Sequence, residues 1–394
     1  MAQRTTEQHA VPFWRDERYL QLLGQLAVVL AVAALFYYLI NNLIHGLAAQ
    51  GIQLGFRFLR LTAGFDIGES LIEYSRSDTV LRALYVGFLN TLLVAFLGII
   101  FATILGIVVG VARLSKNWLI NKIAAVYVEF LRNIPLLVFL FFVYTVIFLK
   151  LPRTDNALSI SFLKIYFSNR GIFIPWGIPG ETFGSWLVIL LVGLILAIVV
   201  GLILYRQGQR TGRMPLIGFW APLTFVVVGL IGWIALPSAP LIKDVPVLQG
   251  RNFVGGRGFS PEFGAMLFSL AVYTSAFIAE IVRAGILAVS KGQREAATAL
   301  GLSPFLTLRL VIFPQALRVI VPPLTSQYLN LTKNSSLAVA VGYPDVFAVA
   351  NTILNQTGRA VEMIGITMIV YLTFSLLTSL FMNWYNARIR LVER

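Results

Sequence analysis

The chain has 394 residues, of which 58% are hydrophobic and only 12% are charged, and its mean hydropathy is +0.82. Soluble domains carry about 25% charged residues, and one globule of this size cannot bury so much apolar surface. The composition therefore excludes a soluble enzyme and a disordered chain. It predicts an all-α polytopic membrane protein.

The ionisable side chains exclude further kinds of chemistry. The sequence has no cysteine, which rules out disulfides and thiolate metal sites. Its two histidines are His9 and His45, so we expect no metal site. The formal net charge is +14, but no basic motif with interleaved aromatic residues indicates nucleic acid binding. On a membrane protein such a charge more often records the orientation of the loops.

Eight stretches are long and apolar enough to cross a bilayer, which takes about 20 residues. They are residues 26–44, 86–112, 123–149, 186–204, 217–236, 263–288, 319–341 and 361–384. We interpret the first as an uncleaved anchor and not as a signal peptide, because polar residues that include Asp16 and Glu17 precede it. With a cytoplasmic N-terminus, 18 Lys and Arg residues face inside and 12 face outside. The distribution predicts that both termini are cytoplasmic.

The order of these stretches suggests a core with additions. Residues 1–80 hold a cytoplasmic N-terminus, an extra helix and a periplasmic segment, and residues 81–394 form the transmembrane domain. An insertion at about 151–261, richest in Gly and Pro over 162–261, interrupts that domain and carries two of the spans. We interpret its Gly-rich run at 254–258 as a flexible loop, because it lacks the context of a phosphate loop, and no G-x-x-x-x-G-K-[ST] motif occurs in the sequence.

A cytoplasmic segment between the sixth and seventh spans is the most informative stretch. Residues 295–300 favour a short helix that contains the small residues Ala296 and Ala297. Gly301 can adopt the left-handed conformation that ends a helix, and Pro304 prevents its continuation, so we expect two turns at most. A second short helix is expected to run through residues 306–310 towards Pro314. The first helix is marginal alone. It either docks on another protein or lies on the membrane as an interfacial loop.

The spacing of Glu295-Ala296-Ala297, Gly301 and Val311-x-Phe313-Pro314 resembles the EAA loop of ABC-importer permeases. Val311 and Phe313 replace the usual Ile and Leu and keep the position apolar. Residues 86–150 and 263–385 resemble permeases of polar amino-acid uptake, with a type I importer core. The extra first span and the insertion are similar to the long Q-type permease of a general L-amino-acid uptake system.

The resemblance implies how the chain would work. The EAA helix would be a coupling helix held by a cytoplasmic ATPase dimer, with Glu295, Ala296, Ala297 and Gly301 at the matching positions. The other implied partners are a second, homologous permease, a periplasmic amino-acid-binding protein and membrane lipid. The chain would bind no cofactor directly, because ATP and Mg²⁺ would belong to the ATPase subunit.

Polar residues inside spans are candidates for a substrate pathway. Lys333 lies about ten residues beyond Pro322-Pro323, near the membrane midplane, where an ionisable side chain usually has a function. Its polar neighbours and a second group form the candidate list: Asn330, Asn334 and Ser335, then Tyr273, Thr274 and Ser275. A cation there could meet a substrate carboxylate. The alternatives are a structural pair of Lys333 with Glu280 or Glu129, and hydrogen bonds between helices for the second group.

Further sequence patterns are more consistent with structural roles. Glu280 and Arg283, and likewise Glu129 and Arg132, are three residues apart, which favours ion pairs at helix ends over gating. The motif Gly106-x-x-x-Gly110 predicts close helix packing. For Asn90-Thr91, helix association and pathway lining remain equally open.

These observations predict a permease subunit that imports polar L-amino acids across a bacterial inner membrane by alternating access and that is not an enzyme. An ion-gradient-driven secondary transporter would also use a midplane charge, but it would need no docking helix. A non-transporting membrane scaffold is the second alternative. Indifference of transport to Lys333 and its neighbours would favour it.

Overall fold

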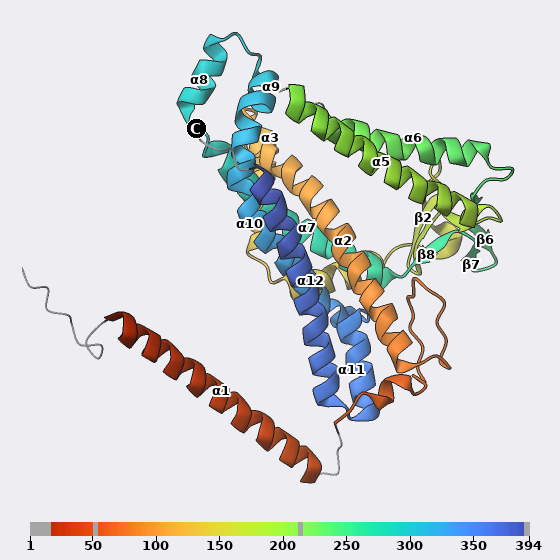
Figure 1. The fold of residues 1–394 in the computed structure, drawn as a ribbon. Coiled ribbons are helices and arrows are strands. Elements are labelled where there is room, and N and C mark those ends of the chain that lie inside the picture. Colours follow the sequence, from red (N-terminus) through yellow and green to blue (C-terminus); the bar gives the residue numbers. More distant parts are fainter. Residues whose placement is uncertain (1–16, 50–53, 212–215, 390–394) are drawn as a thin grey trace, which may run out of the picture.

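A computed structural model describes residues 17–49, 54–211 and 216–389 (Figure 1). Its long helices are α1 (Glu17–Ala49), α2 (Val80–Ala112), α3 (Trp118–Arg132), α5 (Phe183–Thr211), α6 (Ile217–Ala235), α7 (Pro261–Leu287), α10 (Phe313–Asn334), α11 (Val346–Thr357) and α12 (Ala360–Ile389). Within these ranges, seven helices are long and apolar enough to span a membrane, or eight spans result if a bent pair counts as one. The all-α polytopic prediction is therefore confirmed. The predicted location of the termini concerns residues outside the described ranges.

The stretch at 123–149, predicted as one straight span, is broken into two helical pieces. The chain forms α3 and then, after a bend of 106°, α4 (Leu136–Phe142), which continues into the π-helical turn η2 (Val143–Phe148). Pro135 causes the break, because it lacks an N–H and restricts the residue before it to extended conformations. Pro135 is itself extended, with ψ of 133°, at the start of α4.

The helix expected at 306–310 continues past Pro314 and merges with the span predicted at 319–341. Helix α9 (Pro304–Thr307), the π-helical turn η4 (Leu308–Ile312), α10 and the 3₁₀ turn η5 (Ser335–Val341) follow one another as one span of 38 residues. Pro314 falls in the first turn of α10, directly after the wider π-turn. A proline is tolerated inside this continuous span because a local π-helical adjustment accommodates it.

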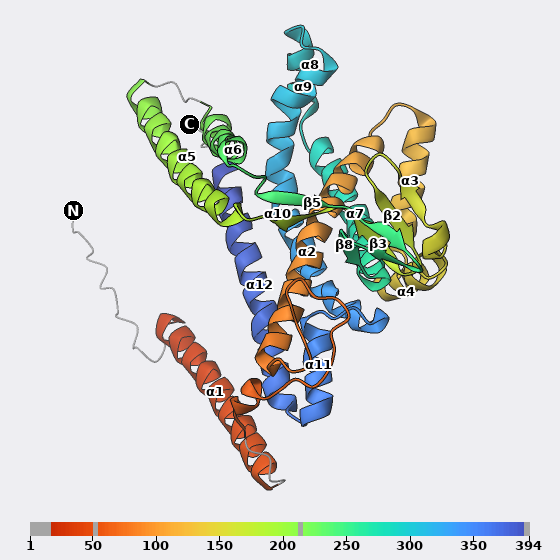
Figure 2. The same ribbon diagram turned by 90° about the vertical axis from the view of Figure 1, so that its right-hand side faces the viewer.

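The core of the bundle is the contact between α2 and α7 (Figure 2). Gly106 and Gly110 lie against α7, as the Gly-x-x-x-Gly motif predicts. A Cβ atom on Gly106 would lie 2.6 Å from Ile278 Cβ, and one on Gly110 would lie 2.7 Å from the carbonyl oxygen of Ala279. Without side chains the two backbones approach closely enough for α7 to bury most of its length.

The insertion contains short strands that hydropathy did not predict. A four-stranded antiparallel sheet has the order β1 (Leu158–Ile160), β2 (Ile165–Ser168), β3 (Gly171–Ile174) and β8 (Arg257–Phe259). Two further antiparallel pairs join β4 (Trp176–Pro179) to β5 (Leu241–Asp244) and β6 (Val247–Gln249) to β7 (Asn252–Val254). Helices α5 and α6 connect β4 to β5 and pack against each other. The side chain of Trp186 helps to join the two helices by donating to Gly229 O at 3.0 Å.

The segment before α2 is attached to the end of the insertion. The buried carboxylate of Glu69 accepts a hydrogen bond from the backbone N–H of Ser260 at 2.8 Å, and Arg257 donates to Ser70 O. Burial raises the pKa of Glu69 above its ordinary value. Ser260 is also the N-cap of α7, where its side chain accepts from Phe263 N. Two additions that are far apart in the sequence thus meet at the start of the central helix.

The glycine contact predicts a specific loss of stability. Gly110→Leu should lower the unfolding temperature of the purified protein, because overpacking a close contact costs about 1–3 kcal/mol. Gly365→Leu is the matched control, since a Cβ atom at Gly365 in α12 meets nothing within 4 Å. Thermal unfolding in one detergent measures both variants, and an equal change in the two would contradict the assigned role of Gly110.

Candidate functional site

The first candidate feature is the short helix α8 (Lys291–Ala299) at one extremity of the molecule, beyond the end of α7 (Figures 1 and 2). It begins four residues before the predicted start and has nine residues. Gly301 has a φ of +73°, as expected for a glycine that ends a helix. In this left-handed conformation, Gly301 N donates to Thr298 O at 2.9 Å and Leu302 N donates to Ala297 O at 3.1 Å.

One face of α8 is held by the bundle. Ala297 is 3% exposed, and α8 contacts the π-turn η4. Arg294 donates to the carbonyl oxygen of Ile286 at 2.8 Å, while Gln315 donates to Gln293 Oε1 at 3.3 Å. These contacts fix the direction in which the helix projects.

The other face of α8 is exposed. Glu295 and Ala296 are both exposed, and the neighbouring Leu300 and Phe305 are exposed by 81% and 68%. Two large apolar side chains beside a small-residue helix are typical of a surface that another protein covers. The predicted residues Glu295, Ala296, Ala297 and Gly301 therefore lie together, with Ala297 alone facing inward.

An ion cluster joins the end of α2 to α7, the helix that leads to α8. Glu280 pairs with Arg283, as predicted, and also with Arg113 at the end of α2. The alternative pairing of Lys333 with Glu280 or Glu129 is wrong, because no such ion pair occurs in the described ranges. The predicted pair of Glu129 and Arg132 is absent from the same part of the chain.

Arg132 contacts an aromatic ring in place of that partner, with its guanidinium carbon 5.6 Å from the centre of the Phe277 ring. Because Phe277 belongs to α7, this contact connects the bend after α3 to the central helix. Such cation–π contacts are worth about 0.5–2 kcal/mol. Spacing along one helix could not reveal it, because the partner lies on another element.

The second candidate feature is a cavity of about 270 Å³ between α7 and α10. Every residue of its lining is polar or aromatic. The lining consists of Tyr273, Thr274, Phe277, Gln327, Asn330 and Asn334. Four of them were predicted from the sequence. The hydroxyl and amide groups offer both donors and acceptors, so the cavity suits a small polar molecule.

The other predicted pathway residues lie outside this lining. Ser275 is buried and shares a hydrogen bond of 2.7 Å with the hydroxyl of Tyr127, and Ser335 is buried and donates to Thr332 O at 2.8 Å. Lys333 is exposed beside the cavity. Sequence reasoning missed Phe277 and Gln327, although Gln327 shares one helix face with Asn330 and Asn334 through the spacing of three and four residues.

The open question of Asn90 and Thr91 is answered by their contacts. Asn90 donates from its side chain to Glu69 O at 2.8 Å and to Pro344 O at 2.9 Å. Thr91 accepts from Val346 N at 2.9 Å. Both side chains therefore attach α11 and the preceding loop to α2, which is a packing role.

Comparisons with known proteins agree with this architecture. The family model described as "Binding-protein-dependent transport system inner membrane component" matches residues 102–391. The chain is 46% identical over 383 residues to the general L-amino acid transport system permease protein AapQ of Rhizobium johnstonii, covering 96% of this chain and 94% of that protein. It is 47% identical over 376 residues to the putative amino-acid ABC transporter permease protein YhdX of Escherichia coli, covering 94% of each.

A third relative has a similar extent. The chain is 42% identical over 416 aligned positions to the glutamate/glutamine/aspartate/asparagine transport system permease protein BztB of Rhodobacter capsulatus, covering 96% of each. The relatives are transport permeases and not enzymes, so the non-enzymatic prediction is confirmed. The chain belongs to the family of inner-membrane components of binding-protein-dependent transport systems.

Proposed function

We propose that this permease imports polar L-amino acids across the bacterial inner membrane. The observation that supports the substrate class most strongly is its near full-length similarity to AapQ, a general L-amino acid permease. BztB, which is named for glutamate, glutamine, aspartate and asparagine, supports the same class. The partners are a second homologous permease, a cytoplasmic ATPase dimer that binds ATP and Mg²⁺, and a periplasmic amino-acid-binding protein. In this arrangement both termini are cytoplasmic.

Helix α8 is the part that receives force from the ATPase. Its exposed face has small side chains that permit close contact, and Leu300 and Phe305 supply apolar area next to it. Its inner face is bonded to the end of α7 through Arg294 and Ile286. Movement of α8 is therefore transmitted to α7, which lines the polar cavity.

The cavity between α7 and α10 is the substrate pathway of this chain. The amides of Asn330 and Asn334 can donate to a carboxylate and accept from an ammonium group, so they match both charged ends of an amino acid. Lys333 adds a cation beside them. Alternating access results when motion of α7 relative to α10 exposes the lining first to one side of the membrane and then to the other.

The coupling role predicts the outcome of a charge reversal. Glu295→Lys should reduce ATP-driven uptake by about tenfold or more. Reversing a charge at the centre of the contact with the ATPase should weaken binding as much as truncating an interface hot spot does. The measurement is amino-acid uptake into proteoliposomes that contain the transporter purified with its subunits through a tag on this chain. Glu181→Lys, the same change at an exposed residue of the insertion, is the control and should transport normally.

The same preparation tests the function as a whole. The purified assembly should contain an ATPase and a second permease, and uptake should need ATP and an added binding protein. Uptake driven by a proton or sodium gradient without ATP would establish the secondary-transporter alternative. Normal uptake by Glu295→Lys would contradict the coupling assignment alone.

The cavity predicts a change in substrate affinity. Asn330→Leu and Asn334→Leu should each raise the half-saturating amino-acid concentration by about tenfold or more, since a hydrogen bond to a charged group is worth about 1.5–3 kcal/mol. Lys333→Gln should also weaken uptake or alter selectivity. Thr325→Val is the control, because the Thr325 hydroxyl donates within its own helix to Val321 O. Wild-type uptake kinetics in both asparagine variants would exclude this cavity as the pathway.

A further inference from the structure

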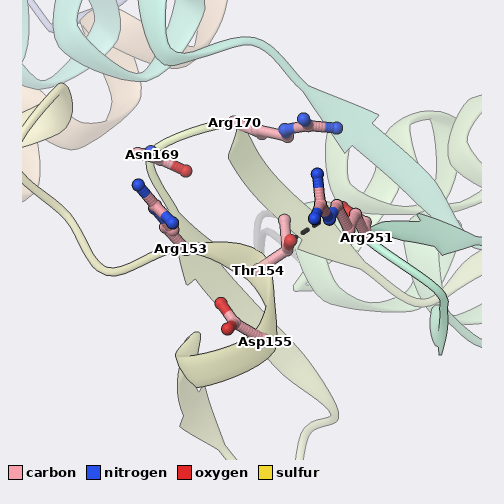
Figure 3. A pocket seen from close by; sticks show the side chains of 6 residues that line it. All are labelled: Arg153, Thr154, Asp155, Asn169, Arg170 and Arg251. Atoms are coloured by element: carbon pink, nitrogen blue, oxygen red, sulfur yellow. Dashed lines mark hydrogen bonds between the residues drawn. The ribbon is translucent and has the colours of Figure 1, made fainter.

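The insertion holds a second polar cavity, which the proposed transport pathway does not use. It has a volume of about 450 Å³ and is lined by Arg153, Thr154, Asp155, Asn169, Arg170 and Arg251 (Figure 3). The three arginines are all exposed and reach the cavity from three different segments. Arg153 precedes the short 3₁₀ turn η3 (Thr154–Asn156), Arg170 lies in the β2–β3 turn, and Arg251 lies in the β6–β7 turn.

Hydrogen bonds between these segments hold the arginines in place. Asn169 N donates to Pro152 O at 2.9 Å, which joins the β2–β3 turn to the segment of Arg153. The hydroxyl of Thr154 donates to Arg251 O at 2.7 Å (Figure 3). The backbones that carry the three guanidinium groups are therefore arranged before any partner binds, which lowers the entropy cost of binding.

The charge at this cavity is not neutralised by the chain itself. In the part of the chain that the structure describes, no carboxylate forms an ion pair with Arg153, Arg170 or Arg251. Arg170 donates to the neutral amide of Asn252, and Asp155 is the one acid in the lining. Three cations against one anion leave a local excess of positive charge.

This charge belongs to a continuous surface formed by the two additions to the core. Arg170 also lines a neighbouring hollow of about 470 Å³, which includes Glu69 and Ser70 from the segment before α2 and Arg257 from β8. Figures 1 and 2 place these strands away from α8. The arginine cavity is thus on the part of the molecule that the charge distribution predicts to face outside, opposite the side of the proposed ATPase contact.

We propose that Arg153, Arg170 and Arg251 form a docking surface for acidic side chains of the soluble periplasmic binding protein. This inference rests on the proposed function, which requires such a partner. Arginine guanidinium groups bind carboxylates in a bidentate manner, and exposed cations guide an acidic protein to its docking position. A protein occupant matches the exposure of three arginines spread over separate turns. An amino acid on its way through the membrane would meet instead the polar lining between α7 and α10, which carries no cation.

The test is a titration of the complete transporter in nanodiscs with the binding protein that copurification identifies. In the variant Arg153→Gln/Arg170→Gln/Arg251→Gln, the half-saturating concentration of binding protein for ATPase stimulation should rise roughly tenfold at low salt, since each exposed ion pair contributes a few-fold. The maximal and basal ATPase rates should stay unchanged. Added salt should weaken wild-type docking much more than docking of the variant.

The control is Lys243→Gln, which removes an exposed cation of β5 that does not line the cavity. It should titrate like the wild type. Equal half-saturation for the triple variant and the wild type would overturn the proposal, as would a lower maximal rate with unchanged half-saturation. Loss of direct binding of free glutamate or of an anionic phospholipid, with docking intact, would assign the cavity to that ligand instead. A wild-type transporter that needs no binding protein would contradict the proposed function itself.

Discussion

The close contact of α2 with α7 is the constraint on which the other features depend. Gly106 and Gly110 place no side chain of α2 against α7, so α7 can pass through the centre of the bundle. Helix α7 begins at Ser260, where the two additions meet, and it lines the polar cavity with Tyr273 and Thr274. Its far end carries the ion cluster of Glu280 and leads directly into α8. A shift of this one helix changes all of these sites together.

The two proposed docking surfaces differ in chemistry. The exposed face of α8 combines small and polar side chains, and the apolar Leu300 and Phe305 lie next to it in the chain. The arginine cavity of the insertion is polar and exposed, and such contacts determine the rate and the salt dependence of association more than its tightness. Hydrogen bonds attach α8 to the end of α7 and to α10, and they join the turns that carry the arginines to one another. The core can therefore keep its packing while partners bind at either surface.

Much of the fold could be predicted from the sequence, because hydropathy is a local property. The number of spans, the close packing at Gly106 and Gly110, and the left-handed Gly301 all follow from short stretches. The 106° bend before Pro135 could not be predicted, since a proline can end a helix, kink it or begin a new one. The pairing of β3 with β8 and of β4 with β5 could not be predicted, because it joins segments on both sides of α5 and α6.

The sequence by itself determined the class of protein, the EAA spacing around Glu295 and four residues of the polar cavity. Only the tertiary structure decided that Ser275 and Ser335 bond within the bundle, that Gln327 joins Asn330 and Asn334, and that Arg132 contacts Phe277. It also assembled three arginines from distant turns into one cavity. The physical reason is that composition and periodicity indicate only whether a segment is surrounded by water, lipid or protein. Which side chains meet depends instead on the packing of segments that are far apart along the chain.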